Sequence, residues 1–104
     1  MQDRFKFRVY DDGKMVYFGQ LVNVGITLPL MQCTGLKDKN GKLIYEGDIL
    51  NYSCLAGYSD IYTCAFNNGS FLIGGLLISN THLKSEVIGN IYENPELLEV
   101  SNEH

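Results

Sequence analysis

The sequence has no tryptophan, and it has only two prolines and three cysteines among its 104 residues. The cysteines are odd in number and lack any C-x-x-C spacing, so they predict neither a disulfide framework nor a zinc site. The longest apolar run, residues 71–78, falls well short of the ~18–20 residues that a membrane-spanning helix needs. Charged residues begin at Asp3, which leaves no apolar signal-peptide core. These absences predict a cytoplasmic protein without a membrane segment.

The residues that are abundant favour β structure. Seven tyrosines, five phenylalanines and eleven glycines are typical of twisted strands joined by tight turns. A chain of this length predicts a single domain over residues 1–104. Residues 1–42 carry seven Lys or Arg against four Asp or Glu, whereas residues 43–104 carry one against eight. Such asymmetry allows two subunits to meet with complementary charge.

An N-terminal hairpin is predicted within residues 4–21. Its turn is Asp12-Gly13, a dipeptide that accepts the positive φ angles of a type I′ turn, and folding there sets Val9 opposite Val16 and Phe7 opposite Phe18. The first strand alternates apolar and basic residues, which predicts one buried and one wet face. The basic residues expected on the wet face are Arg4, Lys6 and Arg8.

A second hairpin is predicted around Asn68-Gly69, with Phe66 opposite Phe71 and Cys64 opposite Ile73. Residues 71–78 are apolar apart from two glycines and therefore predict a central strand covered on both faces. In that register Gly75 lies opposite Tyr62 and leaves room for the ring.

The rest of the chain is organised around residues 31–49. Asn40-Gly41 predicts another type I′ hairpin there, and a solvated corner is expected at Glu46-Gly47-Asp48. Residues 22–30 connect the N-terminal hairpin to a barrel over residues 31–92. Asn94-Pro95 predicts the start of a helical turn over residues 94–100, and residues 101–104 form a loose tail. The expected fold is mostly β: a small, partly open barrel built from hairpins, with a short C-terminal helical turn.

The sequence offers no convincing catalytic or metal centre. Its only histidines are His82, in a polar turn, and His104, the last residue. Cys54 and Cys64 fall on expected core faces, where a thiol acts as a small apolar side chain. Cys33, Cys54, Cys64 and His82 lack the spacing of metal ligands. Glu46 and Asp48 are close in sequence, but we interpret them as turn residues rather than an acid–base pair. We therefore predict a protein that is not an enzyme and has no cofactor.

One surface could serve in binding. The wet face of the first strand combines cations with aromatic residues, and three lysines gather near the turn predicted at Asn40-Gly41. Such a surface could contact phosphates and stack on bases, although a net charge of −4 disfavours binding driven by counterion release. The candidate interaction face comprises Arg4, Lys6, Arg8, Tyr10, Tyr17, Lys37, Lys39 and Lys42.

Two blocks of sequence resemble the signature blocks of the YopX family of phage and prophage proteins. They are Met-Gln-Cys-Thr-Gly-Leu-Lys-Asp-Lys-Asn-Gly-Lys-Leu-Ile-Tyr-Glu-Gly-Asp-Ile at residues 31–49 and Glu-Val-Ile-Gly-Asn-Ile-Tyr-Glu-Asn-Pro-Glu-Leu at residues 86–97. Phe-Lys-Phe-Arg at residues 5–8 is similar to the family's start. Cys33 departs from the aromatic residue often found there, and an early tryptophan common in relatives is absent. The block residues expected to shape turns and packing are Gly35, Asp38, Asn40, Gly41, Tyr45, Gly47, Asp48, Gly89, Asn90, Asn94 and Pro95.

The resemblance implies a mostly β fold with an SH3-like barrel, an oligomer in at least some relatives, and an accessory role in the phage cycle. It implies no catalytic residues. Our leading hypothesis is a non-enzymatic accessory protein in the cytoplasm of a bacterial host, which forms a homo-oligomer and binds an unknown host or phage protein. The alternative is a nucleic-acid-binding module that uses Arg4, Lys6 and Arg8.

Overall fold

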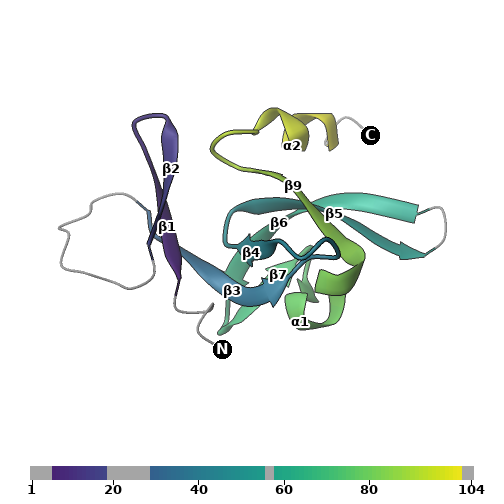
Figure 1. Ribbon diagram of the computed structural model, residues 1–104. Coiled ribbons are helices and arrows are strands. Elements are labelled where there is room, and N and C mark those ends of the chain that lie inside the picture. Colours follow the sequence, from purple (N-terminus) through teal and green to yellow (C-terminus); the bar gives the residue numbers. More distant parts are fainter. Residues whose placement is uncertain (1–5, 19–28, 56–57, 102–104) are drawn as a thin grey trace.

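The computed structural model describes residues 6–18, 29–55 and 58–101. The strands are β1 (Phe7–Asp11), β2 (Lys14–Phe18), β3 (Met31–Lys37), β4 (Leu43–Tyr45), β5 (Asp48–Leu55), β6 (Tyr58–Asn67), β7 (Ser70–Ile73), β8 (Leu76–Leu77) and β9 (Ser85–Asn90). The helices are α1 (Ile78–Thr81), the 3₁₀ turn η2 (His82–Lys84) and α2 (Glu96–Ser101). The strands form one sheet in the order β2-β1-β3-β4 and another in the order β8-β7-β6-β5-β9. The chain is mostly β and curls into a partly open barrel with a short helix near its C-terminal end, as predicted (Figure 1).

The two outer hairpins have the predicted turns and registers. Asp12 and Gly13 have φ angles of 50° and 80°, and Asn68 and Gly69 have 52° and 84°. Both pairs therefore meet the type I′ requirement of positive φ at each central residue. The confirmed cross-strand pairs are Phe7–Phe18, Val9–Val16, Phe66–Phe71 and Cys64–Ile73.

The type I′ prediction for Asn40-Gly41 is wrong. Gly41 has a φ of 87°, but Asn40 is not in the positive-φ region. The Gly41 N–H donates to the Asp38 carbonyl at 3.0 Å, and the Asp38 N–H donates to the Lys42 carbonyl at 2.8 Å. This is a three-residue loop that ends in a glycine bulge. The Asp38 carboxylate selects the longer loop because its Oδ1 accepts the N–H groups of both Asn40 and Lys42.

The prediction of one covered strand over residues 71–78 is also wrong. Gly74 and Gly75 have φ angles of 56° and 83°, so the chain turns back there and divides the run into β7 and β8. A Cβ on Gly74 would collide with the Tyr62 ring, whereas a Cβ on Gly75 would meet nothing. It is therefore Gly74, not Gly75, that leaves room for Tyr62. β8 is an edge strand, and α1 begins directly after it.

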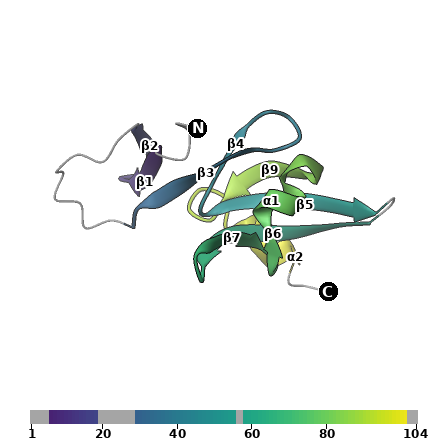
Figure 2. The same cartoon turned by 90° about the horizontal axis from the view of Figure 1, so that it is seen from below.

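β3 joins the N-terminal hairpin to the barrel. Its first residues pair with β1, where Met31 lies opposite Arg8. Its later residues pair with β4, where Lys37 lies opposite Leu43. Figure 2 shows the hairpin to one side of the barrel with β3 running between them. One strand therefore holds together two parts that otherwise meet mainly through side chains.

The barrel is closed by loops as well as strands. Its core contains Ile44, Leu50, Cys64, Ile73 and Ile78, all buried. The turn after β3 docks on β9, since the Lys39 N–H donates to the Ser85 carbonyl at 2.9 Å. The corner at Gly47 reaches both sides of the barrel, because its N–H donates to the Cys64 carbonyl and its carbonyl accepts from Ile91, each at 2.9 Å.

α2 packs against β6 (Figure 1). It covers Glu96–Ser101, so it begins two residues after the expected start at residue 94 and includes Ser101, which was expected in the tail. Leu97 and Leu98 are half-buried. Most of the expected connector at 22–30, and residues 102–104 of the expected tail, lie outside the described residues. No helix within the described segments has the length and apolar character needed to cross a membrane.

Candidate functional site

A buried ion pair joins the N-terminal hairpin to the barrel. The Arg8 Nη2 donates to Asp48 Oδ1 at 2.8 Å and to the Glu46 carbonyl at 3.0 Å. Each of the two charged side chains is only 3% exposed. The guanidinium also lies over the Tyr45 ring, 4.7 Å from its centroid, and 6.0 Å from the centroid of Tyr17. Arg8 is therefore not on the wet face where the alternation of the first strand placed it.

The local backbone explains why Asp48 faces inward. Gly47 has a φ of 86°, a conformation that favours glycine, and a Cβ there would lie 3.0 Å from the Met31 sulfur. The resulting corner turns the Asp48 side chain back, so that Oδ2 accepts the Tyr45 N–H at 2.7 Å. Asp48 is thus an internal anchor, and the prediction of a solvated corner is wrong for it.

The two carboxylates of the corner, Asp48 and Glu46, have different environments. Burial raises the pKa of the Asp48 carboxyl above its ordinary value, and the Arg8 charge and the Tyr45 N–H oppose that rise. Glu46 is half-buried, and its Oε1 accepts the Gln32 N–H at 2.9 Å. Each carboxylate therefore has its own structural partner, and nothing in this geometry brings them together as an acid–base pair.

The loop after β9 forms a compact polar network. Asn90 Oδ1 accepts the N–H groups of Tyr92 and Glu93, and its Nδ2 donates to Glu93 Oε1 at 2.7 Å. Asn94 Oδ1 accepts the Asn90 N–H at 3.1 Å. A Cβ on Gly89 would lie 2.6 Å from that Asn94 oxygen, so only glycine fits there. Pro95 follows at the surface, where its carbonyl accepts the Leu98 N–H.

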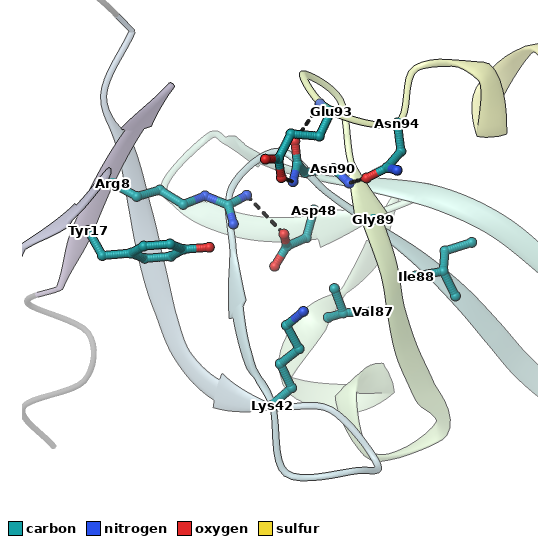
Figure 3. Close-up of a pocket in the computed structure, with 10 residues that line it drawn as sticks. All are labelled: Arg8, Tyr17, Lys42, Asp48, Val87, Ile88, Gly89, Asn90, Glu93 and Asn94. Atoms are coloured by element: carbon teal, nitrogen blue, oxygen red, sulfur yellow. Dashed lines mark hydrogen bonds and ion pairs between the residues drawn. The ribbon is translucent and has the colours of Figure 1, made fainter. Parts of the chain in front are cut away.

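The ion pair and this loop face each other across a cleft of about 270 Å³ (Figure 3). The hairpin, the region from the turn after β3 to the start of β5, and β9 with the loop after it all contribute to its walls. The lining residues are Arg8, Tyr17, Lys42, Asp48, Val87, Ile88, Gly89, Asn90, Glu93 and Asn94. The two sequence blocks thus meet at one place, although they are far apart in the chain.

Asp38 organises a second buried site, next to the cleft. Its Oδ1 accepts the N–H groups of Asn40 and Lys42, each at 2.9 Å, and its Oδ2 accepts the Val87 N–H at 2.8 Å. Burial would raise the pKa of the Asp38 carboxyl, but the hydrogen bonds from Val87, Lys42 and Asn40 outweigh burial, so the pKa lies below its ordinary value of 3.8. This carboxylate fastens the turn to β9.

The structure does not gather the candidate interaction face on one surface. Arg8 is buried, Lys6 is half-buried, and Tyr10 stacks on Tyr92 with ring centroids 5.2 Å apart. Tyr17 is exposed and lines the cleft. The exposed lysines at the turn after β3 are Lys37, Lys39 and Lys42. Arg4 lies outside the described residues. Arg8, Tyr17 and Lys42 therefore meet at the cleft, and the other described members are dispersed.

Sequence reasoning missed part of the cleft wall. Val87, Ile88 and Glu93 were not among the candidates, although all three belong to the second block. Burial of Arg8 had no local signal at all, because its partner is 40 positions away. Asp48 was among the block residues expected to shape turns and packing, but nothing in the sequence linked it to Arg8.

The residues considered for catalysis either have structural roles or lie outside the residues that the structure describes. Burial raises the pKa of the Cys64 thiol to about 12, so it stays protonated at neutral pH. Cys33 is also buried. The His82 Nδ1 lies 2.7 Å from the Lys37 carbonyl. The Cys54 side chain and His104 are not described. Among the residues that are, no three His, Cys, Asp or Glu side chains are grouped to hold a metal ion.

Comparison with known proteins supports the family resemblance of both sequence blocks. The family described as YopX protein matches residues 10–99. The chain is also similar to the crystal structure of protein EF1440 from Enterococcus faecalis, with a TM-score of 0.55 and 34% identity over 85% of this chain and 71% of that chain. No curated protein matches the sequence. The family match extends from β1 to α2 and includes every described residue that lines the cleft except Arg8. The chain therefore belongs to the YopX family.

Proposed function

We propose that this protein is a non-enzymatic accessory protein of a phage or prophage that self-associates and acts by binding a host or phage protein. The observation that supports self-association best is an exposed apolar cluster at the free edge of the five-stranded sheet. Phe66 is 49% exposed, Leu76 43% and Leu77 45%. Exposed apolar clusters of this kind mark protein–protein contacts.

The exposed apolar side chains lie on both faces of the sheet at β6–β8. Phe66 contacts Phe71 on β7, with ring centroids 4.8 Å apart, and Leu76 lies opposite Ile73 on the same face of the sheet. Leu77 lies on the opposite face, so apolar side chains flank the edge strand β8 on both sides. An edge strand presents unpaired backbone groups that can pair with another chain. We infer that a second copy of the chain covers this edge.

Charge complementarity supports the same partner. The described residues up to Lys42 carry a net positive charge, whereas those after Lys42 carry a net negative charge. Two copies arranged head to tail would place unlike charges together. The cluster on β6–β8 belongs to the acidic part and the N-terminal hairpin to the basic part. A copy bound at β8 can therefore present its basic part to this edge.

Analytical ultracentrifugation tests the proposal. Wild type should sediment as an oligomer, and a Leu76→Asp/Leu77→Asp variant should sediment as a monomer with an unchanged circular dichroism spectrum. Leu83→Asp is the matched control, because Leu83 is 70% exposed on η2, outside both the hairpin and β6–β8. A monomeric wild type at high micromolar concentration would refute self-association. Dissociation by Leu83→Asp but not by the double variant would refute this surface.

The alternative from the sequence, nucleic-acid binding, has less support. It needs the basic face of β1, and Arg8 is withdrawn from that face into the ion pair with Asp48. Titration of single- and double-stranded oligonucleotides at several salt concentrations tests it directly. Binding that weakens steeply with salt and is lost when Arg4 and Lys6, the other two basic residues of that face, are changed to Glu would favour the alternative. Absence of binding at low salt would remove it.

A further inference from the structure

Arg8, one of the residues that line the cleft, has a buried donor without an acceptor. Arg8 Nε is fully buried and has no hydrogen-bond partner among the described residues. On a guanidinium, Nε and Nη2 form a fork that suits the two oxygens of a carboxylate. Here Nη2 donates to one Asp48 oxygen and to the Glu46 carbonyl, and the other Asp48 oxygen accepts from Tyr45, so Nε is the arm of the fork that is left without an acceptor. Buried donors are almost always paired, so this unpaired donor points to an acceptor that comes from elsewhere.

The other groups that line the cleft indicate which kind of ligand would bring that acceptor. The Lys42 side chain extends into the cleft toward Asp48 and Val87 (Figure 3). Among the described residues Lys42 forms no ion pair. In contrast, both Asp48 oxygens and Glu93 Oε1 are occupied by donors from the protein. The uncommitted groups are thus mainly donors, and they fit a ligand that brings acceptor oxygens.

The size and the charge balance of the cleft favour a small monoanion. Two cations, Arg8 and Lys42, balance two carboxylates, Asp48 and Glu93, so a dianionic phosphate would leave more uncompensated negative charge in the cleft than a carboxylate would. A volume of about 270 Å³ holds a molecule of amino-acid size. We propose that this cleft binds a small carboxylate, one oxygen of which accepts from Arg8 Nε while Lys42 attracts its charge.

This inference does not depend on self-association, since the cleft and the edge strand β8 share no residue. Titration of ¹⁵N-labelled protein with sodium acetate, followed by NMR, tests it. We expect a saturable shift of the Arg8 Nε resonance and of the Gly89 and Asn90 amides. Sodium chloride at equal ionic strength should leave these resonances unchanged, and sodium phosphate should bind more weakly than acetate.

Two exposed lysines of one turn provide the matched variants. Lys42→Gln should weaken acetate binding about fivefold, as expected for the loss of one partly exposed charge. Lys39→Gln should leave it unchanged, because Lys39 does not line the cleft. The proposal is overturned if acetate produces no saturable shift at Arg8 Nε, if phosphate binds as tightly as acetate, or if the two variants behave alike.

Discussion

Removal of either partner of the Arg8–Asp48 ion pair leaves the other partner as a buried charge without a counter-ion. We expect Asp48→Ala to lower the free energy of unfolding by about 3–5 kcal/mol, because the Arg8 guanidinium would then be buried without its counter-ion. Urea denaturation followed by fluorescence measures this loss. The Arg8→Met/Asp48→Leu double variant should be less destabilised than either single change, since no buried charge remains.

The control for this measurement is an ion pair at the surface. Lys39 and Glu86 are 4.0 Å apart, and both side chains are more than 40% exposed. Lys39→Ala should therefore cost no more than about 1 kcal/mol. Equal effects of Asp48→Ala and Lys39→Ala would show that the Arg8–Asp48 contact contributes no more than a solvated pair.

Asp38 gives the protein a specific dependence on acid. Its pKa in the folded state lies below 3.8, so the folded state holds the proton less tightly than the unfolded state. The stabilisation is therefore complete above the unfolded pKa and is lost as the pH falls through the folded pKa. We expect Asp38→Asn to flatten the dependence of unfolding free energy on pH below about pH 4. An unchanged slope in that range would assign the acid sensitivity to other carboxylates.

At the scale of the strand and the turn, glycine positions determine where the chain reverses. Gly41 has a φ of 87°, and a Cβ there would contact nothing, so substitution costs only backbone strain. We expect Gly41→Val to lower the unfolding free energy by about 1–2 kcal/mol, measured by thermal denaturation. Gly41→Asn should cost less, since asparagine tolerates positive φ. A melting temperature unchanged by valine would show that this bulge is absent in solution.

Turn chemistry explains which elements could be predicted. Asp12-Gly13 and Asn68-Gly69 determine their hairpins through neighbouring residues, so both registers followed from the sequence. Asn40-Gly41 has the same dipeptide character, yet the Asp38 carboxylate captures two N–H groups and produces a longer loop. The turn at Gly74-Gly75 was not predicted, because the surrounding run is apolar and indicates a single strand. Local rules are reliable only where no distant or side-chain acceptor competes.

The cleft could be predicted only in part. The two sequence blocks supplied Asp48, Gly89, Asn90 and Asn94, all of which line it. Their proximity depends on pairing of β5 with β9, which no short-range pattern encodes. The position of Arg8 depends on an acidic partner beyond the next hairpin, and alternation along β1 assigned it to the wrong environment.

At the scale of the whole molecule, the N-terminal hairpin is attached to the barrel by few contacts. Among the described residues they include the pairing of β1 with β3, the ion pair, and the ring contacts Tyr10–Tyr92 and Tyr17–Tyr45. Asp48→Asn keeps the shape of the side chain but removes its charge. We expect it to raise amide hydrogen exchange about tenfold in β1 and β2, and much less in β6 and β7. Exchange measured by mass spectrometry should show this difference, and a uniform increase would contradict it.

The 40 positions between Arg8 and Asp48 also have a consequence for synthesis. A nascent chain emerges from the ribosome N-terminus first, and its segments fold as they become available. The first hairpin is therefore displayed with its cation exposed until β5 has been translated, and only then can that charge be withdrawn. During this interval the early segment is available to chaperones in a form that the finished protein no longer presents.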